Sequence, residues 1–312
     1  MTGSDSPQEE RDGGRPIAES CVVCGGRSRR LFAAHGYVIL GCEGCGHRHT
    51  TPVHDSDHVA RVYGDDYFFA GGAGYADYLR EADLLKARGA GYARNLRRHV
   101  GVGSILDVGA AAGFVLEGFF SEGWKGRGVE PNARMCALAN ERLGPVAEVG
   151  TLESLETTER FDLVSMIQVV AHFPDPRRAL AKAAQLTRPG GFWLIETWDR
   201  DSWTARAFGR HWHEYSPPSV LQWFSRSGLR ALAKSLGFEE VAWGRPRRWI
   251  ELGHARSLLE HKLGGGALRH VLLPLRLVPI SSRVPYPGDD LFWALFRDSR
   301  SGSPLQTSEP RT

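Results

Sequence analysis

The sequence contains no run of about 18 uncharged apolar residues, the length that a membrane-spanning helix requires. Its first 15 residues are polar and acidic, and they lack the apolar centre of a signal peptide. Neither sign of charge dominates, because 39 Lys and Arg stand against 36 Asp and Glu, which gives a net charge of +3. So small an excess gives no general argument for a nucleic-acid or membrane partner. We therefore expect a cytoplasmic protein with no transmembrane segment, and the overall composition does not favour a nucleic-acid partner.

Cysteine is also sparse, since five cysteines in 312 residues do not make the disulfide framework of a small secreted protein. Four of them form two C-x-x-C pairs, Cys21 with Cys24 and Cys42 with Cys45. Four thiolates in two such pairs can hold a tetrahedral zinc ion, and their spacing is that of a zinc ribbon. We expect this zinc to be structural, because four sulfur ligands leave no open position. Two free dithiols are the alternative.

Composition divides the chain into five segments. Both ends are rich in polar residues, Gly and Pro and have little to bury, which predicts disorder. Between them lie the cysteine pairs, then a cluster of aromatic residues followed by an amphipathic helical pattern, then a long α/β stretch. The predicted segments are a tail at 1–20, a zinc ribbon at 21–52, an aromatic and helical lid at 53–100, an α/β domain at 101–298 and a tail at 299–312.

Short apolar runs alternate with helical patterns throughout the α/β stretch. This alternation indicates a parallel sheet covered by helices on both faces, which right-handed crossovers make a doubly wound α/β domain. Strands are expected at 104–108, 126–129, 161–167, 192–196, 239–243 and 291–296. Helices are expected at 78–98, 113–123, 132–143, 176–186 and 220–236.

The stretch ILDVGAAAGF combines a strand with a tight turn and the start of a helix. Gly109 and Gly113 allow the backbone to turn sharply and to approach a ligand closely. Glu130 lies about 20 residues beyond Gly109, at the tip of the next strand, where a carboxylate can bind both hydroxyls of a ribose. The dinucleotide pattern G-x-G-x-x-G would need glycine at Ala111 and Phe114. A ligand without a pyrophosphate therefore fits better, which disfavours a nicotinamide-dependent enzyme.

This stretch is followed in order by GVEPN, FDLVSMIQVVAHFPDP, LTRPGGFWLIE and GFEEV. With these motifs the sequence resembles the class I S-adenosylmethionine-dependent methyltransferases, and in particular a bacterial group with an N-terminal C-x-x-C…C-x-x-C segment. The resemblance covers about residues 20–298. It implies a doubly wound, Rossmann-like class I methyltransferase sheet with a small N-terminal zinc ribbon, and S-adenosylmethionine as cofactor. It does not specify the methyl acceptor.

The resemblance also implies a set of cofactor-binding residues, all at predicted carboxyl ends of strands. The glycine motif would cradle the methionine part of the cofactor, and Glu130 would bind the ribose. The residues after the second and third strands would border the adenine, and the residue after the fourth would lie near the sulfonium. The implied set is Asp107, Gly109, Ala111, Gly113, Glu130, Pro131, Thr151, Leu152 and Gln168.

Three side chains are candidates for a catalytic base. His172 occupies a position where the family commonly has Glu-His before an apolar residue and Asp-Pro, although here Ala171 replaces the Glu. A histidine with a pKa near 6.5 can take a proton from a hydroxyl or an amine. The alternative is that His172 only packs or donates a hydrogen bond in its turn. His213 and Asp199 are further polar candidates.

Taken together, these features predict a methyltransferase acting on a small or carrier-linked acceptor, for which a sugar or secondary metabolite is the leading interpretation. The alternative is a non-catalytic binding protein in which a zinc ribbon and a methyltransferase-like domain only form a scaffold. Arginine clusters at 27–30 and 245–248 leave nucleic acid, an anionic substrate and a plain solvated face open as interpretations. The sequence leaves the methylated atom and the oligomeric state open.

Overall fold

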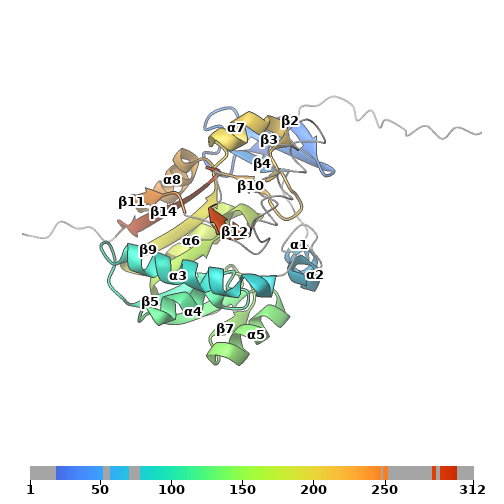
Figure 1. The fold of residues 1–312 in the computed structure, drawn as a ribbon. Coiled ribbons are helices and arrows are strands. Elements are labelled where there is room, and N and C mark those ends of the chain that lie inside the picture. The colour runs from blue at the N-terminus through green and yellow to red at the C-terminus, as the bar shows by residue number, and fades with distance from the viewer. Residues whose placement is uncertain are drawn as a thin grey trace, which may run out of the picture.

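The computed structural model describes residues 19–51, 57–69, 78–246, 249–251, 283–285 and 289–300. Its centre is a large sheet with helices on both faces, and a small antiparallel sheet lies beside it, at the top of Figure 1. Apart from 19–20 and 299–300, the predicted disordered tails lie outside the described residues.

The large sheet has seven strands in the order β11-β14-β9-β8-β5-β6-β7. The strands from β9 to β7 are parallel, whereas β14 is antiparallel to both β9 and β11. The predicted doubly wound, Rossmann-like sheet is confirmed, with β14 as an antiparallel member whose direction the apolar run alone does not reveal. The strands are β5 (Ser104–Val108), β6 (Lys125–Glu130), β7 (Ala147–Val149), β8 (Phe161–Ile167), β9 (Thr187–Trp198), β11 (Phe238–Gly244) and β14 (Leu291–Asp298).

Helices cover both faces of this sheet, as the alternation of strand and helix patterns predicted. On one face, α3 (Ala82–Leu96) and α4 (Phe114–Ser121) bury apolar side chains against β5, β8, β9 and β14. On the other face, α6 (Pro176–Leu186) and α8 (Arg226–Ser235) pack against side chains from the same strands. Adjacent residues of one strand serve opposite faces, since Ile105 packs with the first group and Leu106 with the second. The helix α5 (Ala133–Leu143) follows β6.

The small sheet holds the cysteines and has the strand order β1-β2-β3-β4-β10. Its first four strands come from the N-terminal segment, but β10 (Gln222–Trp223) comes from far along the chain and pairs with β4. The helix predicted over 220–236 is therefore wrong at its start. The helix α8 begins only at Arg226, after the Ser225 hydroxyl accepts a hydrogen bond from the Gly228 amide. The N-terminal strands are β1 (Glu19–Ser20), β2 (Arg27–Ala34), β3 (Tyr37–Cys42) and β4 (Arg48–Thr50).

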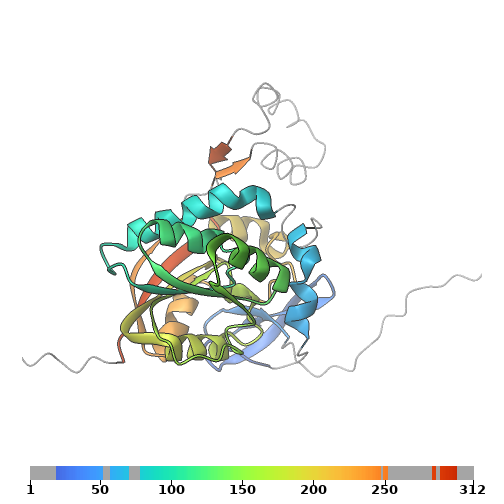
Figure 2. The same cartoon turned by 90° about the horizontal axis from the view of Figure 1, so that it is seen from below.

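The remaining elements are short and lie around the two sheets. Figures 1 and 2 place α1 and α2 beside the edge of the molecule that carries β7 and α5. The strands β12 and β13 form a separate two-stranded pair. No helix in the described part of the chain has the length and apolar character to cross a membrane. These elements are α1 (His58–Val62), α2 (Asp65–Phe69), η1 (Tyr78–Glu81), η2 (Val170–His172), α7 (Trp203–Phe208), η3 (Gly209–His211), β12 (Trp249–Glu251) and β13 (Arg283–Pro285).

The crossing of α3 and α4 leaves no room for a side chain at Gly118. A Cβ there would lie 2.2 Å from the Lys86 carbonyl oxygen and 2.6 Å from the Ala90 amide nitrogen, both of them backbone atoms. We predict that Gly118→Ala lowers the free energy of unfolding by about 1–3 kcal/mol, because backbone overlap must push the helices apart.

Urea denaturation would measure this loss. Gly91 is the matched control, since it lies in α3 with nothing within 4 Å of its Cβ position. Gly91→Ala should instead be neutral or stabilising by up to about 1 kcal/mol, the usual gain in helix propensity. Equal effects of the two substitutions would contradict the packing argument.

Candidate functional site

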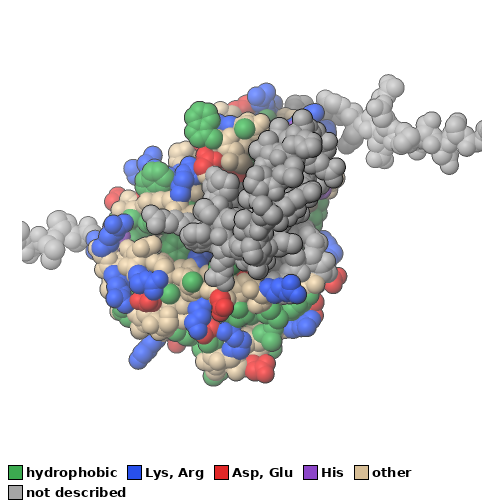
Figure 3. Space-filling view, in the orientation of Figure 1, with side chains coloured by type: hydrophobic (Ala, Val, Ile, Leu, Met, Phe, Trp, Pro, Cys, Tyr) green, Lys and Arg blue, Asp and Glu red, His purple; other side chains and the backbone are tan. Residues whose placement is uncertain are grey.

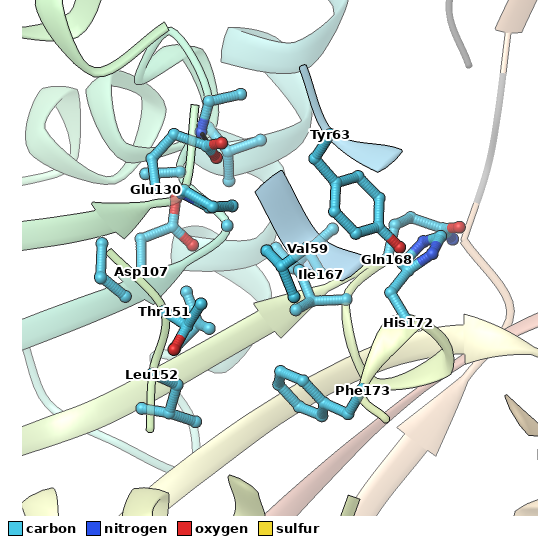
Figure 4. Close-up of a pocket in the computed structure, with 18 of the residues that line it drawn as sticks. Val59, Tyr63, Asp107, Glu130, Thr151, Leu152, Ile167, Gln168, His172 and Phe173 are labelled. Carbon is cyan, nitrogen blue, oxygen red and sulfur yellow. Dashed lines mark hydrogen bonds between the residues drawn. The ribbon is translucent and has the colours of Figure 1, made fainter. Parts of the chain in front are cut away.

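A pocket lies at the carboxyl ends of β5, β6 and β8, where α1 and α2 approach the large sheet (Figure 4). Parallel strands present their carboxyl ends at one edge, which is where α/β sheets bind ligands. Of the predicted cofactor-binding set, Gly113 does not line the pocket but is the N-cap residue of α4, with φ +74°. The other members do line it: Asp107, Gly109, Ala111, Glu130, Pro131, Thr151, Leu152 and Gln168.

The turn after β5 is built from residues in the left-handed region of backbone space. Gly109 has φ +70°, and a Cβ there would lie 2.7 Å from Cγ2 of Val169. Ala111 also has a positive φ, +46°, which is uncommon for a residue with a side chain. This conformation points the Ala111 amide at the tip of the neighbouring strand.

Glu130 ends β6 and is almost fully buried. Its Oε2 accepts a hydrogen bond of 2.8 Å from the Ala111 amide, and its Oε1 accepts one of 2.8 Å from the Asn132 amide. Burial nevertheless raises the pKa of the Glu130 carboxyl to about 7, since the loss of water outweighs the two amides. The carboxylate is held in place and keeps lone pairs for a ligand with hydroxyl groups.

Asp107 is a second buried carboxyl group in the wall of the pocket, at the end of β5. Its Oδ1 accepts a hydrogen bond of 2.5 Å from the Ser165 hydroxyl. Burial raises the pKa of Asp107 to about 7 as well, because the hydrogen bond from Ser165 compensates only part of the lost hydration. The pocket therefore contains two carboxyl groups that are costly to ionise.

His172 lines the same pocket from the turn after β8. Its Nδ1 lies 2.6 Å from the Ser219 carbonyl oxygen, which also accepts a hydrogen bond of 2.8 Å from the Tyr63 hydroxyl. Burial lowers the pKa of His172, so the ring is neutral at pH 7. Figure 4 shows Tyr63, His172 and Gln168 together at one end of the pocket and Asp107 and Glu130 at the other.

The other two catalytic candidates are not among the described residues that line the pocket. His213 pairs with Glu214 at 2.7 Å and lines a separate groove between residues 30–35 and residues 210–213 with Tyr215. Asp199 follows β9, where its Oδ2 lies 3.2 Å from the Arg245 guanidinium. The rest of the arginine cluster that includes Arg245 lies outside the described residues.

Several pocket residues carry no local motif that the sequence could have revealed. Arg88, on α3, lines the pocket and contacts the buried Glu196 of β9. The aromatic residues in and around α2 and η1 form a cluster that is evident in the sequence, but their position over the strand ends depends on tertiary packing. These aromatic lining residues are Tyr63, Tyr67, Phe68 and Tyr78.

The four paired cysteines form a second candidate site, in the small sheet. One ligand atom from each lies within 4.8 Å of all the others. The sulfur atoms of Cys21 and Cys45 are 3.6 Å apart, and those of Cys24 and Cys42 are 3.4 Å apart. No disulfide links them. Four sulfurs at about 2.3 Å from a central zinc would lie at similar separations, so the donor set fits this metal.

The local backbone of the cysteine cluster has the form of two knuckles. The glycines that follow the pairs, Gly25 and Gly46, have φ +72° and +69°, which suits the tight turn of each knuckle. The amides of Val23, Gly26 and Cys45 each lie 3.4 Å from a cysteine sulfur. Donors of this kind stabilise thiolate charge.

Two histidines near the cysteines face away from the cluster. His49 lies 2.9 Å from the Ser28 hydroxyl, and the Nε2 of the buried His47 lies 2.9 Å from Oε1 of Gln222. The side-chain amide of Gln222 in turn donates 3.3 Å to the carbonyl of Phe173, which lines the pocket. A chain of hydrogen bonds therefore joins the end of the second cysteine knuckle to the wall of the pocket.

Comparison with known proteins agrees with this geometry. Residues 78–242 match the family described as methyltransferase domain. The curated relatives include ubiquinone biosynthesis O-methyltransferases of Rhodopseudomonas palustris (strain BisB18), 32% identical over 127 residues, and of Bradyrhizobium sp. (strain ORS 278), 33% identical over 131 residues. Each match covers 39% of this chain and 48% of the relative, so the chain spans about half the length of these relatives.

A solved structure shares the fold. It is the 1,6-didemethyltoxoflavin-N1-methyltransferase of Burkholderia thailandensis with bound 1,6-didemethyltoxoflavin and S-adenosylhomocysteine. The match has a TM-score of 0.51 and 18% identity, and it covers 86% of this chain and 99% of that one. The sheet order, the pocket at the strand ends and the family match over more than half of the sequence lead to one conclusion. The chain belongs to the class I S-adenosylmethionine-dependent methyltransferase family.

Proposed function

We propose that this protein transfers a methyl group from S-adenosylmethionine to a small or carrier-linked acceptor. The observation that carries the proposal is the buried carboxylate of Glu130, fixed by two backbone amides beside a turn that brings the backbone close to the pocket. A carboxylate in this place suits the two hydroxyls of a ribose. Arg88 adds a cationic side chain to the lining, which suits the carboxylate of an amino acid.

The pocket residues fit the cofactor along its length. In the proposed arrangement, Asp107, Gly109 and Ala111 border its methionine part, Pro131, Thr151 and Leu152 border the adenine, and Gly113 shapes the turn from behind. S-adenosylmethionine supplies an already activated methyl group when it is bound. The protein must then orient the acceptor and exclude water, and positioning of this kind can supply several kcal/mol of the barrier.

We assign the base to His172, because of the three candidates it is the one that lines the pocket. Its lowered pKa leaves the ring neutral at pH 7, as proton acceptance requires. The acceptor side of the pocket carries the aromatic rings of Tyr63, Tyr67 and Phe68, which can pack against a planar ring or the apolar face of a sugar. The names of the ubiquinone-pathway relatives support oxygen as the methylated atom. A sugar or secondary metabolite stays the predicted acceptor class.

We further propose that Cys21, Cys24, Cys42 and Cys45 hold a structural zinc ion, and that residues 21–52 act as a zinc ribbon beside a lid at 53–100 and a methyltransferase domain at 101–298. Four sulfur ligands would saturate the metal and leave no position for substrate. The hydrogen bonds from His47 through Gln222 to Phe173 support a mechanical role for the ribbon in shaping the pocket.

Calorimetry with S-adenosylmethionine and S-adenosylhomocysteine tests the main proposal. We expect both ligands to bind and NADH not to bind. Glu130→Ala should weaken both by roughly 100-fold, since two hydroxyl contacts to a charged acceptor are worth about 1.5 kcal/mol or more each. Loss of binding in a variant that still unfolds cooperatively would support the assignment. A folded wild-type protein that binds neither sulfur ligand would refute it and favour the scaffold alternative.

Glu130 should also leave a signature in the pH dependence of stability. Its pKa is about 7 in the folded protein against an ordinary value of 4.5, so between these values the folded state binds more protons than the unfolded state. Stability contributed by this group therefore falls as the pH rises from about 4.5 to about 7 and is then constant. The unfolding free energy of the wild type, minus that of Glu130→Gln, should decrease from pH 5 to pH 8. A difference that does not change with pH would contradict the assignment.

Removing one cysteine ligand tests the metal proposal. We expect stoichiometric zinc in the wild type by emission spectrometry, and loss of zinc in Cys42→Ser. The melting temperature should fall by roughly 10 °C, because metal binding contributes directly to folding free energy. Cys136→Ala is the control, since Cys136 is a buried residue of α5 outside the cluster and its substitution should leave the zinc content unchanged. Full zinc in Cys42→Ser would exclude the four-cysteine site.

A further inference from the structure

A third buried carboxylate, Glu196, lies beside the pocket and is neither a proposed cofactor ligand nor the proposed base. It belongs to β9, and its side chain has no exposed surface. Three side chains contact the carboxylate: the guanidinium of Arg88, the hydroxyl of Tyr92 and the amide of Gln168, whose Nε2 lies 2.6 Å from Oε1. A charge buried in this way is costly unless it is paired and fully hydrogen-bonded, and here three donors surround it.

The pairing with Glu196 fixes which way the Gln168 amide faces. An ionised carboxylate can only accept hydrogen bonds, so Gln168 must turn its nitrogen toward Glu196. The backbone of the same two residues is also joined, since the Gln168 amide donates 2.9 Å to the Glu196 carbonyl. Gln168 has φ +61°, a backbone conformation that residues other than glycine seldom adopt. Both its backbone and its side chain are therefore held by Glu196.

The carbonyl oxygen of the Gln168 side chain is left for the pocket. Gln168 is part-exposed and lines the pocket, and within the described part of the chain no group donates to its Oε1. A fixed oxygen without a donor is an acceptor prepared for a ligand.

The order of the strands places this oxygen at one end of the pocket. Glu130 ends β6, Gln168 follows β8, and β5 lies between the two strands. In the proposed arrangement the ribose lies at Glu130 and the adenine extends toward Thr151, which follows β7. The methionine end of the cofactor then lies over β5 and β8. Figure 4 shows Gln168 there, with His172 and Tyr63, away from Glu130.

We infer that Glu196 is a positioning residue that aims the Gln168 side-chain oxygen at the methyl-transfer end of the pocket. Resting on the proposed function, this inference narrows the acceptor to a nucleophile that carries an O–H or N–H. Such a group donates to the oxygen of Gln168 while it approaches the methyl group, and a carbon nucleophile makes no such hydrogen bond. Gln168 thereby selects hydroxyl and amine acceptors.

Sinefungin tests the inference without knowledge of the acceptor. In this analogue a carbon with an amino group replaces the methylated sulfur, so a charged N–H donor lies where the methyl group would be. S-adenosylhomocysteine has no donor at that place. The dissociation constants of both ligands would be measured by calorimetry for the wild type, Gln168→Met, Glu196→Gln and Tyr92→Phe.

We expect the wild type to favour sinefungin, and Gln168→Met to reduce that preference by roughly tenfold, the effect of one hydrogen bond to a charged donor. Methionine keeps the length of the side chain and lacks the oxygen. Glu196→Gln should reduce the preference as well, because a neutral amide no longer dictates the orientation of Gln168. Tyr92→Phe removes a different donor from the same carboxylate and should leave the preference unchanged.

The ratio of the two affinities separates positioning from a general loss of structure, which would weaken both ligands together. An unchanged ratio in Gln168→Met, or in a folded Glu196→Gln, would overturn the inference while the cofactor assignment stands. If neither ligand binds to the folded wild type, the proposed function fails and the inference falls with it. If Glu196→Gln does not fold, Gln168→Met still decides whether the Gln168 oxygen accepts from the ligand, and an unchanged ratio there overturns the inference.

Discussion

The carboxylate of Glu130 accepts hydrogen bonds from two turns that are separate in sequence, and the arrangement of the pocket follows from this contact. The Ala111 amide ties it to the turn after β5, and the Asn132 amide ties it to the start of α5. Asn132 extends the connection, because its side-chain nitrogen donates to the carbonyl of Tyr63 and to Asp65 in the aromatic segment. Strand tip, glycine turn and covering helices are thus joined around one acid.

The pocket concentrates groups that folding alone would not favour. Burial raises the pKa of both Asp107 and Glu130, and two residues with side chains, Ala111 and Gln168, hold positive φ angles in its wall. Strain and desolvation of this kind persist where the surrounding structure over-determines them, and they are characteristic of functional sites. The rigid sheet beneath supplies that support, since its strands bury apolar side chains on both faces.

Local patterns in the sequence were enough for the elements whose neighbours are close in the chain. The bounds of β5, β8 and α6 agree with prediction, because each is a continuous run with a clear turn or cap. The spacing of Gly109, Gly113 and Glu130 likewise predicted the turn after β5 and the acid at the end of β6. The sequence did not predict features that depend on contacts between distant segments. These are the direction of β14, the two-residue strand β10, and the contact of Arg88 with Glu196. A strand of two residues, such as β10, is too short to show an alternating pattern. The sequence of α3 likewise does not reveal that Arg88 contacts Glu196 in β9.

The pairing of β10 with β4 has a consequence for any attempt to exchange parts between related enzymes. The cysteine sheet is completed by Gln222 and Trp223, and Trp223 packs in one cluster with Ile39 and Trp212. A chimaera joined after residue 51 would graft a foreign four-stranded sheet onto a native fifth strand, with mismatched side chains along the seam. The exchangeable unit is discontinuous, because it comprises the N-terminal strands together with the loop that carries β10.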